Sequence, residues 1–197
     1  MPRTRHGGLR VIAGSVGGLS LVAPKGGAAR PTTDRVKESL FAALGPDRIV
    51  HASVLDLYAG SGALAIEALS RGAGRALLVE RDHAAVKAIR RNLTTTRLRS
   101  QARVQDSTVA TFLGGKPPAE RPFDLVFLDP PYTATTAELG RVLGGLDRTG
   151  WLTEGATVVV ERSSADDTPV AGPESWGTTW ERAYGDTLVT VLTTPIG

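Results

Sequence analysis

The sequence predicts an α/β protein with a Rossmann-like, mostly parallel β-sheet. Short apolar segments typical of buried strands alternate with segments of helical periodicity along most of the chain. The first of these strands, residues 54–58, runs directly into a glycine turn that opens a helix. Near the C-terminus two alternating segments flank Gly185-Asp186, a two-residue hairpin signal. We therefore expect five strands that alternate with helices, followed by a hairpin that closes the sheet.

The composition is that of a globular protein that buries a core. The 197 residues include 41% hydrophobic and 22% charged residues, ordinary values that suit one domain with a small appendage. There is no cysteine, and the three histidines lack metal-ligand spacing, so we expect no metal site and no cysteine nucleophile. No apolar run of about 18 residues is present. We expect a cytoplasmic monomer that does not enter a membrane, since no long heptad calls for a partner.

Basic residues gather near the N-terminus. Residues 1–50 contain eight Lys and Arg against three Asp and Glu, whereas the rest of the chain contains fifteen against seventeen. We expect residues 1–29 to form a basic β-hairpin extension, with its turn at residues 14–18, and residues 30–197 to form the main domain. The charge favours contact between the extension and phosphate groups, and a solvated basic tail is the alternative.

The pattern of residues 30–44 predicts a helix at the start of the main domain. Its apolar stripe consists of Val36, Leu40, Phe41 and Leu44. Thr32 or Thr33 can cap this helix. Arg30 and Arg35 lie off the apolar stripe, which suits either a solvated surface or contact with a substrate.

The glycine turn and a later acid give the first chemical signal. Gly60 and Gly62 follow the first strand, and such glycines let the backbone approach a nucleotide closely. The next strand, residues 75–80, ends in Glu80, twenty residues after Gly60. This is the spacing of a carboxylate that binds both hydroxyls of a ribose. The turn also satisfies the loose dinucleotide fingerprint, so the glycines alone leave NAD open as the cofactor.

The remaining elements continue the alternation of helices and strands. The third strand ends in Asp106. The expected order is helix 84–93, strand 102–106, a short helix near 112–113, strand 123–128, helix 137–146, strand 156–161 and the hairpin of 178–184 with 187–193.

The tetrapeptide Asp129-Pro-Pro-Tyr132 after the fourth strand gives the second chemical signal. The Asp129 carboxylate and the Pro130 carbonyl can accept both N–H bonds of an exocyclic amine, which frees the nitrogen lone pair for attack on a methyl group. The Tyr132 ring would stack on a base taken out of its helix. A strand-ending turn with an acidic tip is the alternative. Together with the terminal hairpin, the tetrapeptide favours S-adenosylmethionine over NAD as the cofactor.

Three stretches of the chain resemble one known family, the RsmD-type 16S rRNA guanine-N2 methyltransferases. These stretches are residues 30–41, 56–73 and 129–132. The resemblance implies the class I S-adenosylmethionine-dependent methyltransferase sheet, with seven strands in the order 3-2-1-4-5-7-6 and the last pair as the hairpin. It also implies a substrate in 16S rRNA of the small ribosomal subunit, already bound by ribosomal proteins.

The resemblance also implies roles for individual residues. Asp56 would lie beneath the methionine part of the cofactor, the ribose would bind Glu80, and the adenine would lie near Arg81 and Asp106. The implied cofactor-binding set is Asp56, Tyr58, Gly60, Gly62, Glu80, Arg81 and Asp106. The implied catalytic residues are Asp129, Pro130 and Tyr132. The implied nucleic-acid-binding residues are Arg10, Lys25, Arg30, Thr33 and Arg35.

The chain departs from the family at the turn of the N-terminal hairpin. Residues 15–19 contain none of the aromatic and basic residues that family members usually carry there, so other basic residues would carry more of the RNA contact. Lys37 also stands where an arginine is expected, and Ala65 where a glycine is expected. Two alternatives stay open: a DNA base methyltransferase that acts on an exocyclic amine such as adenine N6, and a non-enzymatic nucleic-acid-binding module on the same fold.

Overall fold

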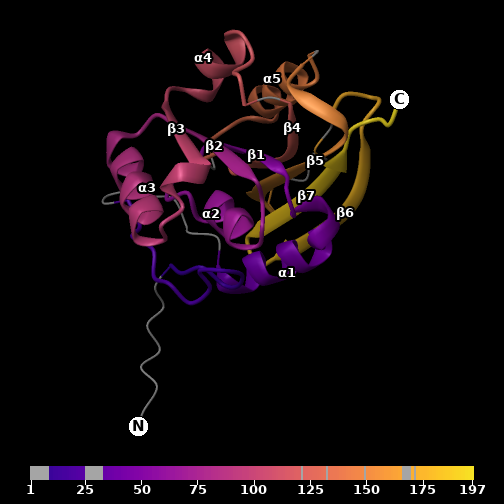
Figure 1. The fold of residues 1–197 in the computed structure, drawn as a ribbon. Helices are drawn as coiled ribbons and strands as arrows, with labels where there is room; N and C mark the ends of the chain where they lie inside the picture. Colours follow the sequence, from indigo (N-terminus) through magenta and orange to yellow (C-terminus); the bar gives the residue numbers. More distant parts are fainter. Residues whose placement is uncertain are drawn as a thin grey trace.

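The computed structural model describes residues 9–24, 33–120, 122–131, 133–148, 150–165, 170 and 172–197. Within these residues one seven-stranded sheet carries helices on both faces (Figure 1). The strands are β1 (Ser53–Leu57), β2 (Arg75–Glu80), β3 (Ala102–Asp106), β4 (Phe123–Leu128), β5 (Leu152–Ser163), β6 (Gly177–Tyr184) and β7 (Thr187–Thr193). The helices are α1 (Asp34–Leu44), α2 (Ala63–Ser70), α3 (His83–Thr95), α4 (Val109–Gly114) and α5 (Thr136–Leu146), with 3₁₀ turns η1 (Pro46–Arg48) and η2 (Arg99–Gln101).

The strand order is β3-β2-β1-β4-β5-β7-β6, which confirms the predicted order. The first five strands pair in parallel, and β7 is antiparallel to both of its neighbours. β1 pairs with β2 on one side and with β4 on the other, so the direction of chain progression reverses at β1. Open α/β sheets bind ligands at the carboxyl ends of the strands beside such a switch point.

Two hydrophobic cores lie on opposite faces of the sheet. α1, α2 and α3 cover one face, and α4 and α5 cover the other (Figure 1). Residues of β1 alternate between the two cores, with Val54 in the first and Leu55 in the second. Phe41 of α1 packs on Phe127 of β4 at 5.8 Å between ring centroids. Burial on both faces explains why the central strands are continuously apolar.

Residues 9–24 are the part of the predicted N-terminal extension that the structure describes, and within them one β-bridge joins Arg10 and Ser20. Backbone bonds extend the pairing, from Val11 N to Leu19 O at 2.9 Å and from Leu21 N to Leu9 O at 2.7 Å. The side chains of Val11 and Leu21 are buried and join the core of α1, α2 and α3. This segment is therefore packed against α1, α2 and α3.

Most predicted boundaries agree with the observed elements, and β5 differs most. It spans Leu152–Ser163 instead of 156–161, because its first residues continue beside β4 across a β-bulge. Gly155 adopts a positive φ of 66° there, a conformation that favours glycine. Thr33 caps α1 through its hydroxyl, which accepts from Val36 N. Thr32 lies outside the described residues.

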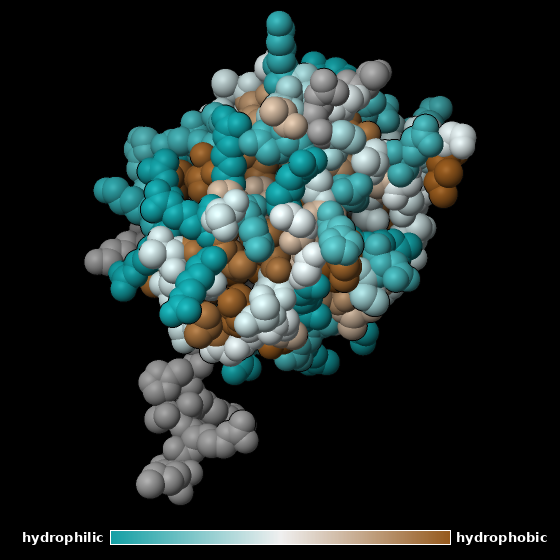
Figure 2. All heavy atoms as spheres, in the orientation of Figure 1, coloured by the Kyte–Doolittle hydropathy of each residue, from teal (hydrophilic) through white to brown (hydrophobic). Residues whose placement is uncertain are grey.

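Hydrophilic residues cover most of the face shown in Figure 2, and hydrophobic residues are visible in separate places between them. In the described ranges, no helix combines the length and apolar character that crossing a membrane requires. The same ranges contain no group of three or more His, Asp or Glu arranged to hold a metal ion.

Candidate active site

Three carboxylates from neighbouring strands gather at the carboxyl edge of the sheet. Asp56 lies in β1, Glu80 ends β2, and Asp129 directly follows β4. Because β1 pairs in parallel with both β2 and β4, the three residues come from adjacent strands at the switch point. The negative charges of Asp129 and Glu80 both act on Asp56. The edge at which a ligand is expected is therefore rich in acidic groups.

Asp56 is held inside the protein by the start of α2. Its side chain is 2% exposed, and its Oδ2 accepts one hydrogen bond, from Ala65 N at 3.2 Å. Burial raises the pKa of Asp56 to about 8; the Ala65 N–H opposes this change, and the neighbouring charges of Asp129 and Glu80 add to it. At neutral pH the protonated form of Asp56 therefore predominates.

Asp129 is partly exposed at this edge, although its carboxyl group is largely buried. The residue keeps part of its surface exposed, as does Pro130 after it. Burial of the carboxyl group raises the pKa of Asp129 to about 7. At neutral pH both the ionised and the protonated forms of Asp129 are populated, so this group can accept a hydrogen bond and can also take up a proton. Tyr132 lies outside the described residues.

The two glycines of the turn after β1 have different surroundings. Both have positive φ, 55° at Gly60 and 76° at Gly62. A Cβ added at Gly62 would lie 3.0 Å from Leu78 Cδ2, so this glycine permits close packing of α2 on the sheet. A Cβ added at Gly60 would have no neighbour nearer than Tyr58 O at 3.9 Å. Gly60 therefore faces the space above the sheet edge.

Tyr58 enters this turn in an unusual conformation. Its φ of 64° is positive, which non-glycine residues adopt infrequently and which often marks a functional site. The side chain is half-buried, and this burial raises the pKa of its hydroxyl. The charge of Arg81 acts on Tyr58 in the opposite direction, so the two predicted cofactor-binding residues lie near each other.

Glu80 joins the end of β2 to the glycine turn. Its Oε2 accepts from Gly60 N at 2.8 Å, and its Oε1 accepts from the backbone N–H groups of Arg81 and Asp82 at 2.8 Å each. Asp106 is its neighbour on β3 and lies 3.4 Å from His83 Nδ1. The predicted cofactor-binding residues are therefore brought together along three adjacent strand ends.

Asn92 on α3 connects this turn to the N-terminal segment, and sequence reasoning missed it. Its fully buried amide donates to Ser61 O at 2.9 Å and to Val22 O at 3.0 Å, and its Oδ1 accepts from Val22 N at 2.7 Å. Asn92 shares the buried face of α3 with Ile89. A polar residue on an apolar helical face was the signal available in the sequence.

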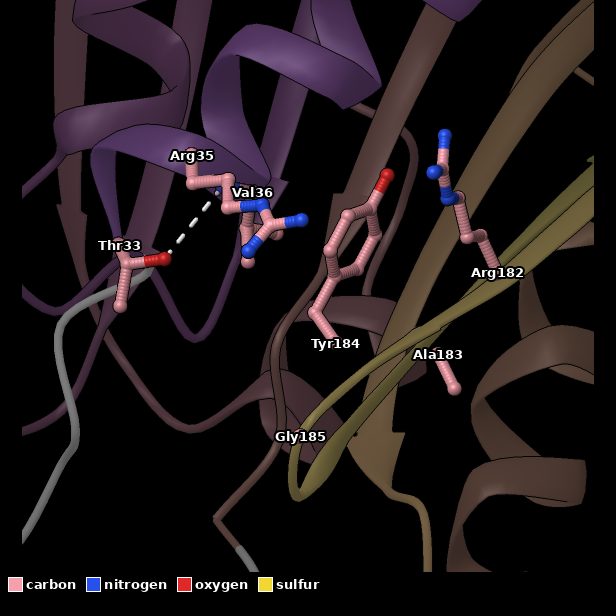
Figure 3. Close-up of a pocket in the computed structure, with 7 residues that line it drawn as sticks. All are labelled: Thr33, Arg35, Val36, Arg182, Ala183, Tyr184 and Gly185. Carbon is pink, nitrogen blue, oxygen red and sulfur yellow. Dashed lines mark hydrogen bonds between the residues drawn. The ribbon is translucent and has the colours of Figure 1, made fainter.

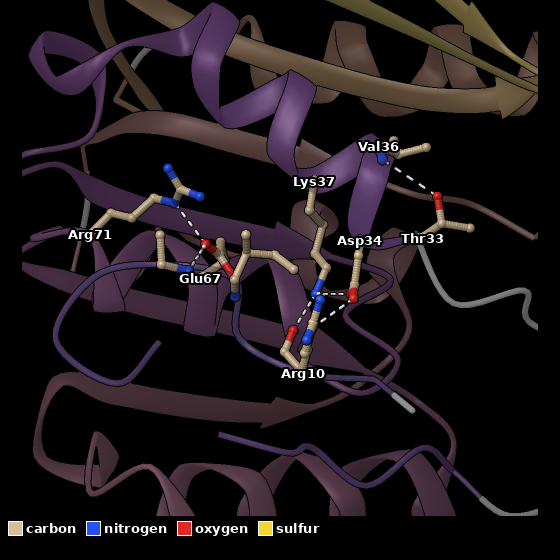
Figure 4. Close-up of polar contacts among 9 residues, drawn as sticks. Arg10, Thr33, Asp34, Val36, Lys37, Glu67 and Arg71 are labelled. Atoms are coloured by element: carbon tan, nitrogen blue, oxygen red, sulfur yellow. Dashed lines mark hydrogen bonds and ion pairs between the residues drawn. The ribbon is translucent and has the colours of Figure 1, made fainter. Parts of the chain in front are cut away.

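The N-terminal segment is also held by buried charged groups of α1 and α2 (Figure 4). Glu67 is fully buried and accepts from Ile12 N at 2.7 Å, from Ala13 N at 3.1 Å and from Arg71 Nε at 2.7 Å. Lys37 is fully buried, and its Nζ donates to the carbonyl oxygen of Arg10. Burial lowers the pKa of Lys37. The substitution of lysine for the expected arginine thus falls on an interior group.

The predicted RNA-binding residues separate into three groups. Arg10 is exposed and its Nε lies 2.8 Å from Asp34 Oδ2. Thr33 caps α1, and Arg35 is exposed on the first turn of that helix. Lys25 and Arg30 lie outside the described residues.

Known proteins are similar to this chain along nearly its whole length. The model of the family described as conserved hypothetical protein 95 matches residues 9–193. The Escherichia coli K12 protein named ribosomal RNA small subunit methyltransferase D is 38% identical over 188 residues, which cover 94% of this chain and 91% of that protein. The Bacillus subtilis protein named putative rRNA methyltransferase YlbH is 39% identical, over 93% of this chain and 97% of that protein.

Solved structures agree with the fold. The structure described as putative methyltransferase yhhF from Escherichia coli superposes with a TM-score of 0.84 at 36% identity, covering 97% of this chain and 100% of that one. SMU.776, a putative methyltransferase complexed with SAH, has a TM-score of 0.65 at 14% identity over 81% of this chain and 48% of its own. This second likeness concerns the fold alone, which is that of a class I S-adenosylmethionine-dependent methyltransferase.

Proposed function

The chain belongs to the family described as conserved hypothetical protein 95, that of the RsmD-type 16S rRNA methyltransferases, and from this we propose that it methylates the exocyclic N2 of a guanine in 16S rRNA. The methyl donor is S-adenosylmethionine, and the substrate is the small ribosomal subunit or its RNA. The coarser activity, methyl transfer to small-subunit rRNA, follows from the family. The choice of guanine N2 comes from the family resemblance, and the chemistry of the site supports an exocyclic amine as the acceptor.

The position of Asp129 carries this proposal. The residue leaves the sheet at the end of β4, next to the switch strand β1, and keeps part of its surface exposed. A carboxylate in this position can meet a base that enters from solvent while the glycine turn binds a cofactor beside it. The pKa of about 7 adds to this argument, because the group is ionised in part at neutral pH.

Residues of the glycine turn and the strand ends would hold the cofactor. The open space beside Gly60 supports the close approach of a ligand. After its three backbone bonds Glu80 keeps a free lone pair on Oε2, which would accept from a ribose hydroxyl. Arg81 and Asp106 would lie beside the adenine. When bound, S-adenosylmethionine supplies a methyl group on a positively charged sulfur. The acidic residues at this edge are compatible with that positive charge.

Asp129 and Pro130 would prepare the amine for attack. The nitrogen of the exocyclic amine is a poor nucleophile because its lone pair is delocalised into the ring of the base. Hydrogen bonds from its two N–H groups to the Asp129 carboxylate and the Pro130 carbonyl would localise that lone pair. The amine must also lose a proton when it gains a methyl group. A carboxylate with a pKa of about 7 is basic enough to receive it at Asp129 Oδ.

Methyl-labelled S-adenosylmethionine tests the proposal with three substrates: small subunits that lack the modification, naked 16S rRNA, and duplex DNA. The labelled nucleoside is identified by mass spectrometry. We expect N2-methylguanosine in rRNA. Label found mainly in DNA, or on another atom of the base, would overturn the proposed target. Calorimetry with S-adenosylmethionine and with NAD tests the cofactor separately.

A further inference from the structure

A concave site lies on the carboxyl side of the sheet, and its lining includes no residue of the glycine turn. It has a volume of about 320 Å³ and is formed by the first turn of α1 and residues 182–185 of the β6–β7 hairpin (Figure 3). Arg35 contributes to one wall and Arg182 to the other. The two walls come from segments that are far apart in sequence and that the fold brings together.

The side chains of this pocket suit an anion, because two arginines and an aromatic ring line it. Arg35 and Arg182 are exposed, and within the described residues neither forms an ion pair with a carboxylate. The guanidinium carbon of Arg182 lies 5.4 Å from the centre of the Tyr184 ring, and Figure 3 shows this ring between the two arginines. The Tyr184 hydroxyl bonds to Ser39 on α1, which fixes the ring in place. Asp34, beside Arg35, is already paired with Arg10.

The register of the sheet relates this pocket to the candidate active site. Glu161 of β5 pairs with Val189 of β7, and Val189 pairs with Arg182 of β6. Leu128 is the last residue of β4 and lies opposite the residue before Glu161. Extending that register by one residue places Asp129 in the same row as Arg182, three strands away. The spacing of neighbouring strands makes this a separation of roughly 14 Å.

The row also lies on one face of the sheet. Val189 belongs to the core beneath α1, and directly paired residues project to the same face. Phe127, two residues before Asp129, packs on Phe41 of α1 and marks the same face at β4. A strand of nucleic acid that delivers a base to Asp129 therefore has Arg182 within reach on the same side.

We propose that the pocket binds a phosphodiester group of the RNA strand that carries the target base, with Arg35 and Arg182 as the two cations and Tyr184 as the flat wall. This inference rests on the proposed function, because it assumes that the polymer is RNA. Arginine suits the site because its planar, multiply donating head binds phosphate oxygens in pairs. The pocket adds Arg182 and Tyr184 to the RNA-binding residues predicted from the sequence.

The salt dependence of RNA binding tests this assignment. The probe is a short fluorescent single-stranded RNA, titrated with the whole protein at several salt concentrations. Each phosphate contact on a single strand contributes about 0.7 to the slope of log binding constant against log salt. We expect Arg182→Gln and Arg35→Gln each to reduce the slope, and the double variant to reduce it by about this amount, because the two arginines share one phosphate. Arg182→Lys keeps the charge and is expected to retain the slope while the affinity falls, because the paired donors are lost.

Arg99→Gln is the matched control. Arg99 is exposed in η2, which leads into the opposite, amino end of β3, and we expect its loss to leave the slope unchanged. Wild-type slopes in both Arg182→Gln and Arg35→Gln would overturn the pocket assignment. If the wild-type protein still methylates rRNA in that case, the proposed function stands. If it methylates no RNA, the proposed function fails, and the slopes still decide whether the pocket binds phosphate.

Discussion

At the scale of single residues, Asp129 lies at the end of a buried strand and has a raised pKa. It follows a buried strand, so its backbone is fixed, while part of its surface stays open to a substrate. Its raised pKa of about 7 means that the ionised form becomes dominant only above neutral pH. Methyl transfer that needs the carboxylate should therefore increase as the pH rises through about 7.

We predict that Asp129→Asn lowers the rate of methyl transfer by about 100-fold or more, because the amide is neither a charged acceptor nor a base. Single-turnover assays with labelled S-adenosylmethionine measure this rate, and calorimetry is expected to show cofactor affinity close to wild type. Asp47→Asn, an exposed change in η1, is the matched control. An unchanged rate in Asp129→Asn would remove this carboxylate from the mechanism.

At the scale of elements, α1, α2 and α3 do more than cover the sheet. Each presents a buried polar side chain to the N-terminal segment: Lys37, Glu67 and Asn92. Asn92 reaches both this segment and the turn that contains Gly60. The N-terminal segment and the cofactor turn are therefore joined through one side chain.

We predict that Asn92→Ala lowers the free energy of unfolding by about 2–4 kcal/mol, because three hydrogen bonds to the backbone of Val22 and Ser61 are lost. The same change should weaken S-adenosylmethionine binding, since the turn loses an anchor. Urea unfolding and calorimetry measure the two effects. Thr95→Ala, at an exposed position of the same helix, serves as the control. Full cofactor affinity in a folded Asn92→Ala protein would show that the turn does not depend on this anchor.

A separate prediction concerns Glu67. In Glu67→Gln one carboxylate oxygen becomes an N–H₂ group, which faces donors rather than acceptors. We expect a loss of about 2–3 kcal/mol in the free energy of unfolding and faster hydrogen exchange at Ile12 and Ala13, whose N–H groups it binds. Glu38→Gln, exposed on α1, should change neither quantity. Unchanged protection of Ile12 and Ala13 would contradict this role for Glu67.

At the scale of the whole molecule, the sheet edge keeps acidic groups at its centre and arginines at its margin. β1, β2 and β4 bring Asp56, Glu80 and Asp129 together, whereas β6 carries Arg182 at the far end of the sheet. This separation suits a positively charged cofactor at the centre and a polyanion at the margin. The buried central acid also links folding stability to pH.

We predict that the protein without added cofactor becomes less stable as the pH rises from about 4 to about 8. The folded state retains the Asp56 proton up to a pKa of about 8, whereas the unfolded chain releases it near 3.8. Between these values the folded state binds more protons, so the free energy of unfolding falls, by at most about 1.4 kcal/mol per pH unit from this group. Asp56→Asn can still accept from Ala65 N and should make the dependence in urea unfolding less steep, leaving the share that the raised pKa of Asp129 contributes below about pH 7. An equally steep dependence in that variant would assign it to other groups.

The sequence by itself determined the order of elements and several of their bounds. Strands 75–80, 102–106 and 187–193 were predicted to the residue, because alternation and continuous apolar runs are local properties of the chain. The glycine turn and the acid after β4 were also visible, since each directly follows a buried strand. Resemblance to a family supplied the strand order.

The tertiary structure alone decided which polar residues are interior. Lys37 and Asn92 occur in helices with many exposed charges, and periodicity does not reveal that a distant segment covers them. Likewise, the row from Asp129 to Arg182 exists because β7 inserts between β5 and β6, which brings the last hairpin to the edge where the substrate is expected. Burial and pairing between distant segments depend on how the whole chain packs, so no local pattern specifies them.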